Sequence, residues 1–372
     1  MPFFVYLRDM KKIVLLLAIV LLAVSCRESQ SEFEVKEVDF VNKSDVTVKG
    51  TPVDVEFPLD LRDIAVCDSY RILMCNDGEA RMSVYSADWD FLGRFCFIGR
   101  ARNEFINQPS MVSGQILRTD GRMLIPLTDG LQDVKIMDLQ QSLDAGRTIM
   151  WGKTDYRPFK EMVIKEEYGT MTLRNDINFV FIDNDINHQF EWCRPMMMGG
   201  IHVDPYFAVM NDTAVISKID LHNYFDDEQF KFIGGKLFKH PSRNLVILPM
   251  EIIDYILFID LDKDRMWAVH QQGSLSLFDQ LPPVNFSITH FGRSAVCTES
   301  CFMILYFGGD PNAEDIYREN AFPELLTFDW EGNFLKSVKL DTHVNRIAYD
   351  EKTQTLYGVD RTNDRIVSFD LK

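Results

Sequence analysis

The sequence lacks the short motifs by which common enzymes and metal proteins are found. It contains no GxSxG nucleophile elbow, no HExxH zinc pair, no Walker phosphate loop and no EF-hand pattern. Its seven cysteines form no CxxC pair and no mixed Cys/His spacing, which argues against the usual zinc sites. We therefore expect no catalytic constellation of these classes, no metal ion and no other cofactor.

Cysteine is also too scarce to form the framework of the fold. If Cys26 is modified, as argued below, six thiols remain, and a chain of 372 residues is long enough to fold without disulfides. An even number still permits disulfides in an oxidising compartment. Cys297 and Cys301 are the one pair close enough in sequence to span a hairpin turn. The other cysteines are Cys67, Cys75, Cys96 and Cys193.

The sequence also has fewer basic residues than acidic ones. The chain has 39 Lys and Arg residues against 56 Asp and Glu residues, which gives a formal net charge of −17. A surface of this sign repels phosphate backbones, so we expect no nucleic-acid partner. A cationic partner would fit such a surface, and simple solvation would explain it equally well.

What the sequence does contain is a sharp N-terminal signal. A basic start at residues 11–12 precedes an unbroken apolar run, residues 13–24, and a polar stretch follows Cys26. An apolar run of this length is too short to span a bilayer comfortably, and a basic start with a small-residue exit is typical of a cleaved export signal. We interpret residues 1–25 as a signal peptide, with Met10 as the true start; a buried helix is the alternative.

The end of this signal, LLAVSC, resembles a bacterial lipoprotein signal. The resemblance implies that Cys26 receives a diacylglycerol on its thiol and a further acyl chain on the new N-terminus. Several acyl chains give stable anchoring, because a single chain binds a membrane only marginally. Residues 26–45 then predict a lipid-anchored tether that runs into a lead-in strand. The localisation implied is that of an exported outer-membrane lipoprotein facing the periplasm or the cell surface.

The rest of the chain, residues 46–372, is organised around the stretch from Ile64 to Phe95. This stretch predicts four short strands (IAVC, RILMC, RMSVY and FLGRF), because short apolar runs alternate with turn residues. Such a meander cannot bury both faces alone and becomes stable when copies pack against it. The same ending, a hydrophobic residue followed by Asp or a small polar residue, recurs at Ser86, Asp138, Asp220, Asp260, Asp329 and Asp370.

These strand endings lie about 57 residues apart on average, within the range of a large propeller blade. We therefore predict an all-β fold, a six-bladed β-propeller with four-stranded antiparallel blades. The long gap between Asp138 and Asp220 could hide a further copy, which leaves seven blades as the alternative. The last unit stops at Asp370 without an outer strand, and residues 33–40 or 51–57 could supply it. An N-terminal strand would then complete the last blade and close the ring.

An acylated leader, degenerate strand meanders and the GRARNEF turn at residues 99–105 together resemble the TolB-like six-bladed propeller lipoproteins of Bacteroides-type bacteria. The resemblance implies a noncatalytic cell-envelope protein that uses a propeller face to bind a protein, a peptide or a glycan. Two alternatives stay open. One is a metal-dependent hydrolase of the lactonase kind, and the other is a structural partner of an outer-membrane complex.

Two groups of side chains are candidate binding residues. Arg100, Arg102 and Glu104 crowd the GRARNEF turn, where Arg forks could recognise a carboxylate or a sulfate. A solvated loop with an internal Arg/Glu pair is the alternative. His202 and Asp204 lie two residues apart, so an extended segment places them on one side, as a base and its orienting partner or as metal ligands. A structural His/Asp pair is the alternative there, because the sequence shows no third partner.

Overall fold

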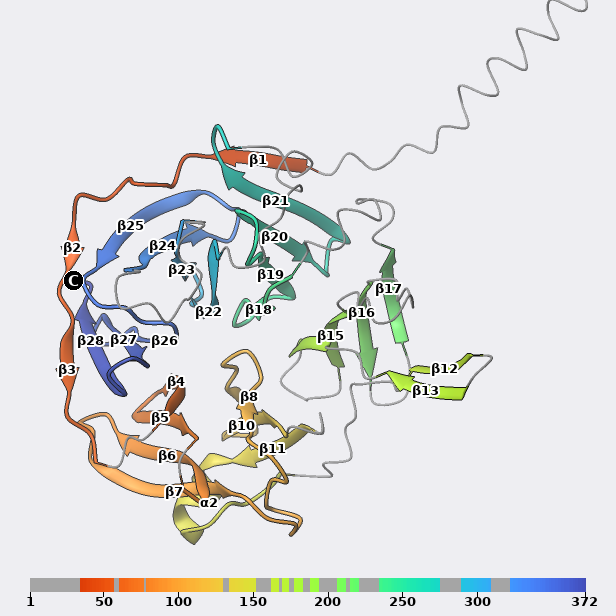
Figure 1. Cartoon of the computed structure of the whole chain (residues 1–372), viewed down its shortest axis with the longest axis vertical. Coiled ribbons are helices and arrows are strands. Elements are labelled where there is room, and N and C mark those ends of the chain that lie inside the picture. The colour runs from red at the N-terminus through yellow and green to blue at the C-terminus, as the bar shows by residue number, and fades with distance from the viewer. Residues whose placement is uncertain are drawn as a thin grey trace, which may run out of the picture.

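The structure is a computed structural model in which twisted sheets stand side by side around a central axis (Figure 1). It is an all-β propeller, as predicted. The structure describes residues 34–56, 60–76, 78–129, 134–151, 162–166, 169–173, 177–182, 188–193, 206–211, 215–220, 234–274, 289–308 and 322–372.

Six sheets of four or five strands and one separate hairpin contain the described strands. The first sheet consists of β4 (Leu61–Cys67), β5 (Tyr70–Cys75), β6 (Ala80–Ser86) and β7 (Phe91–Phe97). The second consists of β8 (Ser110–Met111), β9 (Leu117–Thr119), β10 (Arg122–Thr128) and β11 (Val134–Asp138), and is followed by the helix α2 (Leu139–Ala145). The third consists of β14 (Ile177–Phe181), β15 (His188–Cys193), β16 (Tyr206–Asn211) and β17 (Val215–Asp220).

The remaining sheets each recruit one strand from the N-terminal segment. The fourth consists of β18 (Phe238–Lys239), β19 (Leu245–Pro249), β20 (Tyr255–Asp260), β21 (Arg265–Gln271) and β1 (Glu34–Val38). The fifth consists of β22 (Phe291–Cys297), β23 (Cys301–Tyr306), β24 (Glu324–Asp329), β25 (Phe334–Leu340) and β2 (Thr47–Val48). The sixth consists of β26 (Ile347–Asp350), β27 (Thr355–Asp360), β28 (Arg365–Asp370) and β3 (Thr51–Val53). The separate hairpin is β12 (Met162–Glu166) with β13 (Gly169–Leu173).

The stretch from Ile64 to Phe95 folds as the sequence predicts. Its four segments are β4 to β7, paired antiparallel in chain order. Burial is highest in the two middle strands: β5 is buried at five of its six positions and β6 at five of seven, against four of seven for the innermost strand β4 and two of seven for the outer strand β7. The apolar runs are therefore longest in the strands that have a neighbouring sheet on each face.

The recurring strand endings mark the sheets, with one correction. Ser86, Asp138, Asp260, Asp329 and Asp370 each end the third strand from the axis, but Asp220 ends β17, the fourth strand of its sheet. At five of these six positions the side-chain oxygen explains the recurrence, since it accepts a hydrogen bond from a backbone N–H group of the following residues. Asp329 Oδ1, for example, accepts from Glu331 N at 3.0 Å and Asn333 N at 2.7 Å. Such a turn can follow any strand, so the pattern does not identify the strand's rank.

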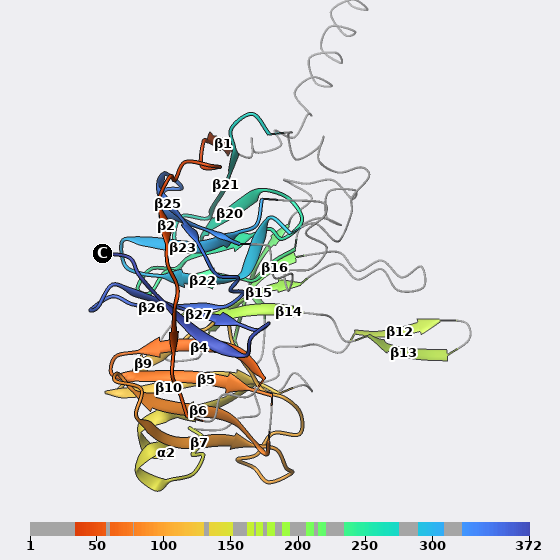
Figure 2. The same cartoon turned by 60° about the vertical axis from the view of Figure 1, so that its left-hand side comes forward.

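Residues 34–53 form an N-terminal belt around the rims of three sheets (Figures 1 and 2). β1 pairs in parallel with β21, and β2 pairs in parallel with β25. β3 pairs antiparallel with β28, with Thr51 opposite Ser368 and Val53 opposite Ile366. Of the two segments predicted to complete the last sheet, residues 51–57 do so through β3, whereas residues 33–40 contain β1 and join the fourth sheet instead. The prediction of four antiparallel strands throughout is wrong for the fourth and fifth sheets, because the belt adds a fifth, parallel strand to each.

Side chains that bridge neighbouring sheets hold the ring together. The first and sixth sheets share an apolar cluster that includes Leu73, Tyr85 and Val359. A buried ion pair crosses the same interface, between Arg71 of β5 and Asp350 at the end of β26, at 2.5 Å. Because both charges are desolvated, this contact depends on the two sheets staying in register.

Candidate functional site

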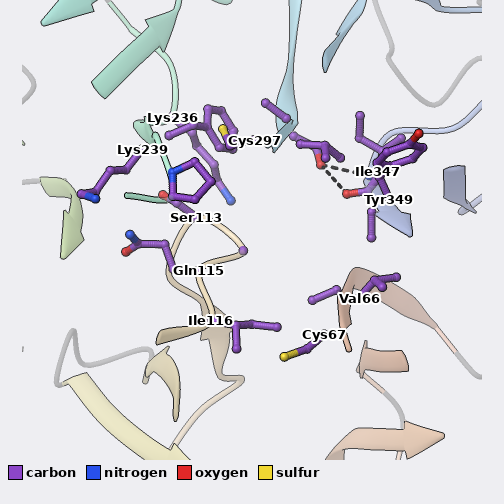
Figure 3. A pocket seen from close by; sticks show the side chains of 18 of the residues that line it. Val66, Cys67, Ser113, Gln115, Ile116, Lys236, Lys239, Cys297, Ile347 and Tyr349 are labelled. Atoms are coloured by element: carbon purple, nitrogen blue, oxygen red, sulfur yellow. Dashed lines mark hydrogen bonds between the residues drawn. The ribbon is translucent and has the colours of Figure 1, made fainter. Parts of the chain in front are cut away.

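A cavity of about 290 Å³ lies on the axis of the propeller, and the innermost strands of all six sheets contribute to its wall. Figure 3 shows side chains from around the ring facing this axial cavity, with the amine of Lys236 directed toward its middle. Pockets of roughly this size and larger are the usual sites for small ligands. Apolar wall residues include Ile64, Ile116, Phe181, Phe238, Ile347 and Tyr349.

Hydrogen bonds between adjacent sheets fix the wall of the axial cavity. Gln115 bonds to both backbone groups of Phe181, accepting from its N–H at 2.9 Å and donating to its carbonyl at 3.1 Å. Ser294 and Ile347 make the same kind of link, in which Ile347 N donates to Ser294 Oγ at 3.0 Å. These side chains replace backbone pairing between sheets, so they hold the wall in one geometry.

Charged groups line the axial cavity near the starts of several innermost strands. Asp63 lies in β4, Arg293 in β22, and Lys236 precedes β18 by two residues. Arg293 is paired with Glu251, with 2.8 Å between Nη2 and Oε2. Arg118, on the wall contributed by the second sheet, is paired with Asp68 of the first sheet at 2.6 Å.

His240 borders the axial cavity, but its ring is occupied by structural contacts. Its Nδ1 accepts hydrogen bonds from Ser242 N and Arg243 N, each at 3.1 Å. This leaves Nε2 as the protonated nitrogen, which donates to Glu299 O at 3.2 Å. Burial lowers the pKa of His240, so the ring is neutral at pH 7. It therefore has no ring nitrogen left to act on a molecule in the cavity.

Two cysteines also face the axial cavity as thiols. Burial raises the pKa of Cys67 to about 11 and raises the pKa of Cys297 as well, so neither is a thiolate nucleophile at neutral pH. Cys297 and Cys301, the pair close enough in sequence for a disulfide, are both free. Cys301 Sγ instead lies 3.4 Å from Thr298 Oγ1. Cys67, Cys75 and Cys96 are free too and buried, as small hydrophobic side chains are.

The sequence-predicted binding residues are placed away from the axial cavity or outside the described residues. Arg100 and Arg102 are exposed, and Glu104 is half-buried. Glu104 Oε2 accepts from Ala101 N at 2.8 Å, so its carboxylate closes the GRARNEF turn. Cys26, His202 and Asp204 lie outside the residues that the structure describes.

Two features are absent from the described residues. No group of three or more His, Cys, Asp and Glu side chains there is arranged to hold a metal ion. No helix in that part of the chain is long and apolar enough to cross a membrane.

The charged residues of the axial cavity were missed by sequence reasoning, although a signal exists. Three of them lie near or just before the start of an innermost strand whose other residues are mainly apolar: Asp63 in RDIAVC, Lys236 in GGKLF and Arg293 in FGRSAVC. A single charge at the start of a strand is ordinarily a solvated end. Only the ring arrangement brings these strand starts together.

The fold and the cavity define this protein as a β-propeller with a ligand-sized axial cavity. No protein-family model matches the sequence, and no curated protein matches it. Among solved structures it is similar to a Bacteroides fragilis protein that is described as exported. The two chains are 10% identical, with a TM-score of 0.49, over 90% of this chain and 98% of that one.

Two further structures give similar values. The β-propeller domain of Myceliophteria thermophila Cps50 (Swd1) is 9% identical, with a TM-score of 0.48, over 87% of this chain and 100% of that one. A Bacteroides thetaiotaomicron protein of unknown function is 9% identical, with a TM-score of 0.47, over 87% of this chain and 74% of that one. Similarities this distant carry no argument about function.

Proposed function

We propose that the protein is a noncatalytic binding protein of the cell envelope, and that its ligand, part of a protein, a peptide or a glycan, enters the axial cavity. The observation that supports this proposal is the cavity itself. Its wall combines apolar side chains with a few charged ones, and side chains such as Gln115 and Ser294 hold it rigid. That is the composition of a preformed ligand site.

The same proposal includes six blades and membership of the TolB-like lipoproteins. Every sheet of four or five strands contributes to the cavity wall, which supports one blade per sheet. In this proposal the exposed Arg100 and Arg102, with Glu104, are a second set of binding residues, and His202 and Asp204 are a separate third set. The acidic chain has no nucleic-acid partner.

A direct test uses side-chain bulk in the axial cavity. Ile116→Trp adds volume at a half-buried wall position, and Leu92→Trp adds the same side chain at an exposed position of β7. A panel of small molecules, short peptides and oligosaccharides is screened by thermal shift against both variants and the wild type. We expect ligands that stabilise the wild type to lose their effect with Ile116→Trp and to keep it with Leu92→Trp. Equal binding by all three proteins would place the site elsewhere, and turnover of a ligand would overturn the noncatalytic assignment.

Export and anchoring form the second part of the proposal. Residues 1–25 act as the signal, residues 26–45 carry the lipid and lead into the fold, and residues 46–372 form the propeller. Eight residue-to-residue steps separate Cys26 from Glu34, the start of β1. At full extension they reach at most about 30 Å, so the propeller stays close to the membrane surface.

The anchor predicts a simple fractionation result. Cys26→Ala removes the thiol that would be acylated, so the protein should leave the membrane fraction and change its electrophoretic mobility. Cys301→Ala, which changes a free cysteine inside the propeller, should leave both unchanged. If Cys26→Ala fractionates and migrates like the wild type, the protein is not acylated at this residue.

A further inference from the structure

The charges that line the axial cavity are opposite in sign to the protein as a whole. Four described wall residues, Arg118, Lys236, Lys239 and Arg293, are cationic, and Asp63 is anionic. The whole chain carries a formal charge of −17. Low-dielectric walls concentrate the field of such groups, so the cavity attracts anions that the outer surface repels.

Three of the four cations already have acceptors. Arg118 is paired with Asp68, and Arg293 with Glu251. Lys239 Nζ donates to the carbonyl of its neighbour at 2.9 Å. These groups supply positive potential, but their strongest contacts are made within the protein.

Lys236 differs from the other three. Among the described residues, none lies within hydrogen-bond or ion-pair distance of its Nζ. Its side chain is half-buried, and its amine points toward the middle of the axial cavity (Figure 3). An ammonium in this position has lost part of its hydration without gaining an acceptor in exchange.

The charges that act on Lys236 from a distance leave it undercompensated. Burial lowers its pKa, Asp63 raises it, and Arg346 and Arg293 lower it, while Glu251 has a smaller raising effect. Lys236 and these four groups together are three cations and two anions, an excess of one positive charge. One monoanion would balance the group, whereas a phosphate dianion would leave an excess negative charge in a poorly solvated site.

We propose, on the basis of the binding function above, that the axial cavity takes a single carboxylate carried on an uncharged, largely apolar body, and that Lys236 is the residue that binds the carboxylate. The body packs against Phe238, Ile347 and Tyr349, which line the same cavity. A small organic acid and the free C-terminus of a peptide share this chemistry. Because Arg293 is engaged by Glu251, the contact is a point charge rather than a bidentate guanidinium fork.

The test compares matched probes on the full-length protein by calorimetric titration. 3-Phenylpropionate carries the carboxylate, 3-phenylpropionamide has the same body without charge, and inorganic phosphate carries charge without the body. A short peptide with a free C-terminus and its amidated form distinguish a peptide end from a free acid. We expect the acid or the free peptide to bind, and the amide and phosphate to bind much more weakly.

Variants assign the effect to Lys236. Lys236→Met keeps the length of the side chain without the charge and should weaken binding of the acid by about tenfold to hundredfold, the usual value of a hydrogen bond to a charged group. Lys49→Met, at an exposed position, is the control and should bind normally. Lys236→Met should also be at least as stable as the wild type, because it removes a desolvated charge, so lost binding would not reflect unfolding.

The outcomes separate this inference from the binding function. Equal binding of acid and amide, with both lost in Ile116→Trp, would overturn the role of Lys236 and leave the cavity as a neutral site. Tighter binding of phosphate would overturn the choice of a carboxylate. If binding of the acid were unaffected by both Lys236→Met and Ile116→Trp, the site would not be the axial cavity and both proposals would fail.

Discussion

Replacement of Arg71 by Leu should cost the protein about 3–5 kcal/mol of unfolding free energy, the usual cost of removing one partner from a buried ion pair. Arg71 and Asp350 have side-chain exposures of 2% and 7%, and their ion pair joins the first sheet to the sixth. Without the guanidinium, the carboxylate of Asp350 stays buried beside apolar neighbours. Urea unfolding followed by tryptophan fluorescence measures the loss.

Two further variants test the cause of this loss. Arg71→Leu combined with Asp350→Asn should be more stable than Arg71→Leu alone, because the double variant has no unpaired buried carboxylate. The Asn side-chain oxygen can still accept a hydrogen bond from Lys352 N, as Asp350 Oδ1 does at 3.0 Å. Arg118→Leu removes an exposed pair and should cost less than about 1 kcal/mol. Similar losses for Arg71→Leu and Arg118→Leu would show that burial of the ion pair does not determine its contribution.

Replacement of Phe40 by Ala should also cost about 3–5 kcal/mol, the range for truncation of a buried aromatic residue. Phe40 belongs to the N-terminal belt and has no exposed surface. Its ring centroid lies 5.6 Å from that of Tyr306 and 5.5 Å from that of Phe328, while its backbone N–H donates to Gln271 Oε1 at 2.9 Å. The ring thus packs the belt against the fifth sheet, and the backbone N–H bonds it to β21 of the fourth.

The belt itself gives the readout for Phe40→Ala. Amide hydrogen exchange in β1 and β2 should accelerate more than in β5, because the cavity left at the rim loosens the belt before the centre of the ring. Phe97→Ala, at a position 38% exposed on β7, is the control and should cost less than about 1 kcal/mol. Uniform acceleration through the whole ring would mean that the belt has no separate stability.

Much of the fold could be predicted from the sequence because the repeated strands are long and apolar. The four strands within Ile64 to Phe95, and the completion of the last sheet by an N-terminal strand, follow from alternation, turns and a missing outer strand, although the sequence did not choose between residues 33–40 and 51–57. β2 could not be predicted, since it has two residues and its partner strand begins at Phe334. The helix α2 was also missed: it is one short segment, set by the Asp138 cap that accepts from Gln141 N at 3.0 Å.

The candidate site was much less predictable than the fold. Clusters within a few residues, such as the GRARNEF turn, can be seen in a sequence, and the structure shows that Glu104 closes that turn. Lys236 and Asp63 are 173 positions apart, and each directly precedes a run of apolar residues. Their proximity comes from the ring, which local patterns do not encode.

The N-terminal belt also sets the order in which the protein can mature. A ribosome releases residues 34–53 long before their partner strands, which begin at Arg265, Phe334 and Arg365. Through most of synthesis these strands have nothing to pair with, and non-local pairings of this span form slowly. The axial cavity needs the first strand of every sheet, including β26 near the end of the chain. A truncated translation product therefore has neither a closed ring nor a complete cavity, and the binding proposed for this cavity would be confined to full-length chains.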